Sequence, residues 1–130
     1  MQAQLWPALI TFGTILLMFG CAIFVGRARG LYKIDAPATT GPEGFERAFR
    51  VQMNTLENAV VFLPTLWLAA AFANPTLTAV AGGVWLLARV WYAIAYAHDA
   101  KSRGKPFALA MLAWLALLLA TGWGLIRAFA

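Results

Sequence analysis

The chain has 130 residues, 62% of them hydrophobic, with a mean hydropathy of +0.73 and a formal net charge of +5. A soluble domain of this length has too little interior to bury so much apolar surface, so the composition excludes a water-soluble fold and indicates a membrane protein. The length allows one domain, residues 1–130, with about four spanning helices of roughly 20 residues each.

The first predicted span, residues 5–26, is uncharged and long enough to cross a bilayer. No Lys or Arg precedes Arg27, whereas a secretory signal begins with positive charges, so we expect a retained helix and not a cleaved leader. Cys21 lies in this apolar stretch, where a buried, inert thiol is expected. With a single cysteine and a single histidine, His98, the chain has no internal disulfide, and we expect no metal site.

The one long polar connection is predicted over residues 27–44, because Pro and Gly are frequent there. Pro42 and Glu43 can start the next helix, since proline fits a first turn and the helix dipole favours an acidic residue there. Pro64 is expected to bend this second helix. Asn74-Pro75 predicts a tight reversal, which makes the second and third helices antiparallel neighbours. The predicted spans are residues 5–26, 45–73, 76–100 and 107–128.

Basic residues gather in the first and third connections, and an even number of crossings puts these two segments on the same side. The only basic residue on the opposite side is Arg127. The positive-inside rule therefore predicts that both termini lie outside and that the basic segments face the cytoplasm. The basic residues concerned are Arg27, Arg29, Lys33, Arg47, Arg50, Lys101, Arg103 and Lys105.

A polar stripe begins the second helix. Arg50, Asn54 and Glu57 are spaced i, i+4, i+7 and share one helical face, while Gln52 points elsewhere, toward a neighbouring subunit. Arg47 extends the stripe by one turn. A guanidinium, a carboxamide and a carboxylate suit a small zwitterionic peptide, since Arg binds a carboxylate and Glu an ammonium.

A second stripe lies on the third helix, where Arg89, Tyr92 and Tyr96 are spaced i, i+3, i+7. Arg103 shares this face if the helix continues that far. A charge as deep as Arg89 needs a partner, and Glu57 is the expected one. A structural ion pair and an interfacial aromatic belt would explain single residues. Two polar stripes meeting on one side of a membrane favour a binding pocket instead.

These residues also carry a family resemblance, over most of the chain from Arg29 onward. The chain resembles the membrane-associated proteins in eicosanoid and glutathione metabolism, the MAPEG family, and is most similar to its leukotriene C4 synthase and microsomal glutathione transferase members. The motifs are Thr39-Thr40-Gly41-Pro42, Phe45-Glu46-Arg47, Arg50-x-Gln52-x-Asn54-x-x-Glu57 and Ala88-Arg89-x-x-Tyr92-x-x-x-Tyr96, with Arg103 and Pro106 following.

The resemblance implies an all-α, up-down, left-handed four-helix bundle that assembles as a homotrimer. It implies glutathione as co-substrate, bound between subunits near the cytoplasmic face, and a lipophilic electrophile arriving from the lipid. Arg103 matches the arginine beside the glutathione sulfur, where a guanidinium favours the thiolate of a thiol whose free pKa is about 8.5. The glutathione-contacting positions match Arg29, Arg50, Gln52, Asn54, Glu57, Tyr92 and Tyr96. Arg89, assigned to the same binding set, matches a basic position that some members use.

Three positions depart from leukotriene C4 synthase: Asn58 replaces a tyrosine, and Gly30 and Lys33 replace arginines. They argue against leukotriene synthesis and favour a general glutathione transferase or lipid hydroperoxide peroxidase. A non-catalytic scaffold that binds lipid or glutathione is the alternative. A small multidrug transporter fits less well, because such proteins need an acidic residue in the first span. The compact chain favours a bacterial member, located in the inner membrane.

Overall fold

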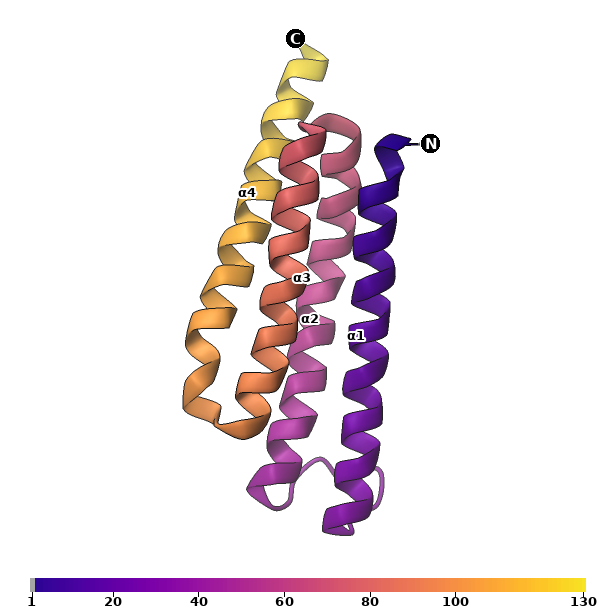
Figure 1. Cartoon of the computed structure of the whole chain (residues 1–130), viewed down its shortest axis with the longest axis vertical. Helices are drawn as coiled ribbons and strands as arrows, with labels where there is room; N and C mark the ends of the chain where they lie inside the picture. Colours follow the sequence, from indigo (N-terminus) through magenta and orange to yellow (C-terminus); the bar gives the residue numbers. More distant parts are fainter. Residues whose placement is uncertain (1) are drawn as a thin grey trace.

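The computed structural model describes residues 2–130, with side chains from Gln4 onward. This part of the chain forms four long helices in up-down order and one short 3-10 helix, which confirms the all-α bundle (Figure 1). By length and composition, all four long helices can cross a membrane. The elements are α1 (Gln2–Tyr32), α2 (Glu43–Phe72), α3 (Pro75–His98), η1 (Ala100–Arg103) and α4 (Gly104–Phe129).

The first helix is longer than predicted, because α1 continues past residue 26 to Tyr32. Most of these last residues are exposed, but one side of the helix stays packed, since Val25 and Ala28 are buried in a cluster with Phe45 of α2. Lys33 then adopts a left-handed conformation, with φ of 55°, which is a common way to end a helix. Residues 27–32, expected in an irregular connection, are therefore helical.

The second helix begins at Glu43 as expected, and the Glu46 carboxylate accepts a hydrogen bond from the Gly41 N–H at 3.1 Å. α2 runs through Pro64 without interruption. The predicted reversal at Asn74-Pro75 is confirmed, because the Asn74 Oδ1 accepts from the Thr76 N–H at 2.9 Å and caps α3. An asparagine in this position satisfies N–H groups that the first turn leaves free.

The third helix ends at His98, earlier than the sequence predicts, and the fourth begins at Gly104, before residue 107. Between them Asp99 caps η1, with its Oδ1 accepting from the Lys101 N–H at 3.1 Å. Aspartate side chains compete with helical backbone bonds in this way. Arg103 is consequently not on a continuation of α3.

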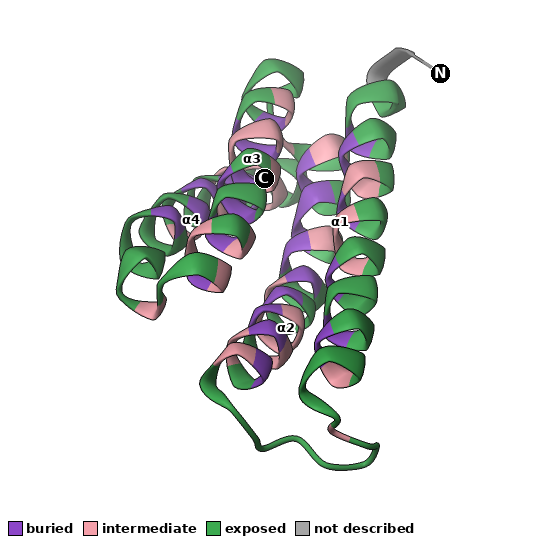
Figure 2. Cartoon of the chain, turned by 60° about the horizontal axis from the view of Figure 1, so that its bottom comes forward, coloured by how far each residue is buried: buried purple, intermediate pink, exposed green. Residues whose placement is uncertain are grey.

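The core lies between the helices. Phe62 of α2 and Trp85 of α3 stack with ring centroids 3.5 Å apart, in a buried cluster that also contains Leu66 and Leu117. α1 packs on α2 and α3, and α4 packs on α3 and α2. The outer surfaces of the helices are exposed (Figure 2). They are rich in large apolar side chains, as expected where the solvent is lipid.

The two ends of the bundle differ in charge. Both termini lie at one end, and the α1–α2 connection and η1 lie at the other (Figure 1). Most of the basic residues are in these two segments or beside them, while Arg127 is in the last turn of α4, at the opposite end. The first and third connections thus lie at the same end of the bundle, as expected when the chain crosses the membrane an even number of times between them.

Candidate functional site

A column of two stacked tyrosine rings with an arginine at each end follows α3 and η1. The Arg89 Cζ lies 4.1 Å from the ring centroid of Tyr92, and the Tyr92 and Tyr96 rings stack 5.6 Å apart with an interplanar angle of 15°. The Arg103 Cζ lies 5.2 Å from the Tyr96 centroid. Arg103 thus joins the α3 stripe as expected, but it does so from η1 and not from a longer helix.

The two predicted stripes meet at a hollow of about 260 Å³ between α2, α3 and the start of α4. Asn54 comes from α2, Tyr92 from α3 and Arg103 from η1. The ring of Phe107 lies 6.2 Å from that of Tyr92. The hollow is lined by Asn54, Tyr92, Arg103, Gly104 and Phe107.

Beneath the hollow, Arg89 has a different partner from the one expected. Its Nη2 donates to the Asn54 Oδ1 at 3.1 Å and to the Thr55 Oγ1 at 2.9 Å. Glu57 is exposed on α2 and forms no ion pair with Arg89 within the chain. The expectation of a Glu57–Arg89 pair is therefore wrong for the single chain, because the shorter side chains of Asn54 and Thr55 face α3.

Sequence reasoning did not identify Thr55 or the role of Asn58. Thr55 is a fully buried polar residue in the buried stripe of α2, which is apolar apart from Thr55 and Thr65, and that break in the pattern was the available signal. The Asn58 Nδ2 donates to the Asn54 carbonyl at 2.9 Å and to the Asn54 Oδ1 at 3.3 Å. In this chain Asn58 therefore supports Asn54.

The remaining candidates lie on two sides of α2. Arg50 and Glu57 are exposed on the side of Asn54, whereas Gln52 is rotated from Asn54 by about 200° around the helix axis. Arg29 lies on α1, where its Nη1 donates to the Ala38 carbonyl at 2.9 Å and its Cζ is 5.1 Å from the Phe45 centroid. One chain does not bring Gln52 and Arg29 to the hollow.

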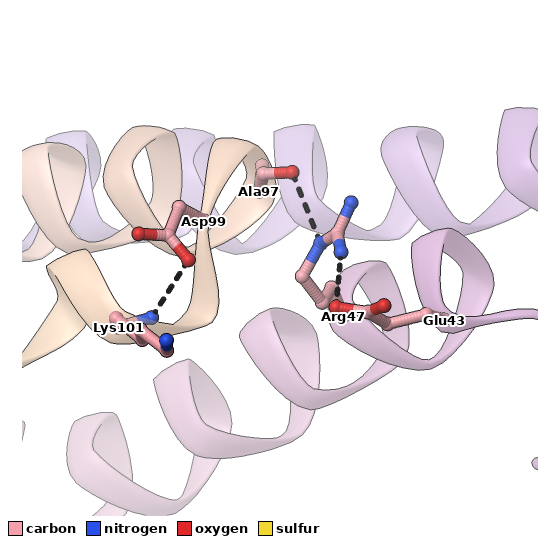
Figure 3. A network of polar contacts seen from close by, with 5 residues as sticks. All are labelled: Glu43, Arg47, Ala97, Asp99 and Lys101. Atoms are coloured by element: carbon pink, nitrogen blue, oxygen red, sulfur yellow. Dashed lines mark hydrogen bonds and ion pairs between the residues drawn. The ribbon is translucent and has the colours of Figure 1, made fainter.

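A polar network fixes the basic end of α3 (Figure 3). The Arg47 Nε donates to the Ala97 carbonyl at 3.3 Å, and its Nη1 pairs with the Glu43 Oε1 at 2.6 Å. This is the one ion pair among the described residues. The Arg47–Ala97 hydrogen bond ties α2 to the last turn of α3, directly before the capped 3-10 turn that carries Arg103.

The fold and the hollow define a four-span membrane protein with a cationic, tyrosine-lined site at its basic end. The MAPEG family model matches residues 7–123, and the chain belongs to the MAPEG family. It is 50% identical to an uncharacterized protein of Synechocystis over 88% of this chain and 83% of that protein. It is 39% identical to leukotriene C4 synthase of Cavia porcellus, over 88% and 77% of the two chains. It is 41% identical to human microsomal glutathione S-transferase 2, over 78% and 70%.

Proposed function

We propose that this chain is a membrane glutathione transferase that conjugates glutathione to a lipophilic electrophile. The observation that carries the proposal is the convergence of Asn54, Tyr92 and Arg103 on one hollow. Its relatives support the same co-substrate, since they include proteins named leukotriene C4 synthase and microsomal glutathione S-transferase 2.

In this proposal Arg50, Asn54 and Glu57 hold the peptide, and Arg103 acts on the sulfur. A guanidinium and a carboxylate on one helical face match the carboxylate and ammonium of glutathione. The Arg103 guanidinium favours the thiolate, which is the nucleophile. The thiolate attacks an electrophilic carbon of a lipid-borne substrate, so that a carbon–sulfur bond forms as the bond to the leaving group breaks. In the reduction of a lipid hydroperoxide, two glutathione molecules supply the two electrons and become the disulfide, while the hydroperoxide becomes an alcohol and water.

The proposed site lies between subunits of a homotrimer. Arg29 and Gln52 are across α2 from the hollow, so they can reach a bound tripeptide only from a neighbouring copy. Arg50 and Glu57 are exposed on a helix long and apolar enough to span a membrane, and polar groups there are costly in lipid unless covered. In the proposed assembly the site faces the cytoplasm, and the excess of basic residues at that end of the bundle supports this orientation.

The test is conjugation of glutathione to a generic aryl halide by the purified protein in detergent, with reduction of a lipid hydroperoxide measured in parallel. Product formation that saturates with glutathione supports the transferase. Tight glutathione binding without either product would point to the non-catalytic scaffold. Absence of glutathione binding would overturn the proposal.

A further inference from the structure

Arg89 is a charged side chain fully buried inside the bundle, and no acidic side chain of the described residues neutralises it. Its exposed fraction is 0%, and its Nε and Nη1 have no hydrogen-bond partner. Its Nη2 contacts only neutral oxygens, from Asn54 and Thr55 of α2. The titratable groups near it are the Cys21 thiol of α1 and the Tyr92 phenol of its own helix. No carboxylate of the described residues pairs with it.

A buried charge without a counter-ion is costly, and its field reaches far because the surroundings screen it weakly. The hollow lies on the other side of Asn54 and Tyr92, both of which contact Arg89 and line that hollow. An anion bound in the hollow would therefore experience this charge without touching it. The negative charge of such an anion offsets the positive charge of the Arg89 guanidinium.

The same contact fixes the direction of the Asn54 carboxamide. A guanidinium has only N–H donors, so the Asn54 oxygen must face Arg89. Asn58 donates to the same oxygen from the next turn of α2. Asn54 lines the hollow together with Tyr92 and Arg103, and because Arg89 and Asn58 both donate to its oxygen, the group that it can offer a ligand there is its N–H donor. A hollow lined by donors selects acceptor and anionic groups.

We propose that Arg89 is an electrostatic and positioning residue of this site, which orients Asn54 and favours the thiolate form of bound glutathione without contacting it. The inference rests on the proposed function, because it names glutathione as the anion. In the ligand-free protein, where no anion is bound, the charge of Arg89 lowers the stability of the fold.

The experiment compares wild type with Arg89→Gln, Arg89→Met and Arg89→Lys in detergent. Titration of the ultraviolet absorbance of bound thiolate should show the pKa of the glutathione thiol rising by about one unit in the Gln and Met variants. In Arg89→Lys, which keeps the positive charge, the pKa of the glutathione thiol should stay near the wild-type value. Affinity for S-methylglutathione, which cannot ionise at sulfur, should fall in the Met variant, because Asn54 loses its donor.

The thermal unfolding temperature of the ligand-free protein is the second readout. Replacing an unpaired buried charge by a neutral side chain should leave it unchanged or raise it. A purely structural Arg89 would give lower unfolding temperatures and an unchanged thiol pKa, and that result would overturn the inference while the transferase proposal stands. Wild type that binds no glutathione would overturn both, whatever the unfolding temperatures.

Discussion

The guanidinium of Arg103 lies over the ring of Tyr96, with its Cζ 5.2 Å from the ring centroid, although α3 ends between them at His98. The 3-10 turn after Asp99 brings Arg103 back against α3. Cation–aromatic contacts of this kind fix the direction of a charged side chain. The position of the proposed thiolate-stabilising group thus depends on one short turn as well as on the helices.

Removal of the Arg103 guanidinium should abolish most of the conjugation. Without it the bound thiol returns toward its free pKa of about 8.5 and is mostly protonated at neutral pH. We expect kcat of Arg103→Ala to fall by about a hundredfold or more, which is the scale for losing one charge-stabilising donor. Steady-state kinetics measures the effect, with subunit assembly checked by size-exclusion chromatography. Arg127→Ala removes an arginine at the opposite end and should keep full activity; undiminished activity of Arg103→Ala would refute the assignment.

The arrangement across α2 predicts complementation between inactive subunits. One variant carries Arg29→Ala and Gln52→Ala, and the other carries Asn54→Ala and Arg103→Ala. If each site takes one set from one subunit and the other set from its neighbour, mixed assemblies contain intact sites. Co-expression should then restore conjugation that neither variant has alone. Activity that stays at the level of the separate variants would place each site within one chain.

The cap on η1 predicts an effect of Asp99, which is outside the hollow. Asp99→Ala removes the acceptor for the Lys101 N–H and the Ser102 hydroxyl. Loss of such a cap costs about 1 kcal/mol, equivalent to roughly a fivefold loss of the correctly placed turn. We expect kcat to fall by about that factor, with the affinity for S-methylglutathione nearly kept. Asp35→Ala, in the α1–α2 connection, is the matched control and should behave like wild type.

Two glycines of α4 give a sharp test of the packing. A Cβ added to Gly124 would collide with the backbone carbonyl of Phe72, whereas Gly122 has open space around it. Gly124→Ala should therefore lower the thermal unfolding temperature markedly, because neither backbone can move aside without parting α2 from α4. Gly122→Ala should be neutral or stabilising by up to about 1 kcal/mol, the helix preference of alanine over glycine. Equal thermal unfolding temperatures of the two variants would contradict this packing of α2 against α4.

Helix periodicity found much of the site in advance. Arg50, Asn54 and Glu57 lie on one side of α2, and Tyr92 and Tyr96 on one face of α3, because the i, i+3, i+4 spacing is a local property of the helix. The partner of Arg89 was not predictable in the same way. Glu57 offers the opposite charge, but Thr55 is the residue whose position on α2 faces α3.

The sequence by itself determined the four spans, the basic end of the bundle, the family and the residue types of the site, because each follows from local composition, spacing and motif. The tertiary structure alone decided that α1 extends to Tyr32, that η1 carries Arg103 onto Tyr96, and that Asn54 and Thr55 hold Arg89. These features depend on which side chains meet when helices pack. Such contacts depend on the distance and direction between side chains in space, which the positions of opposite charges in the sequence do not determine.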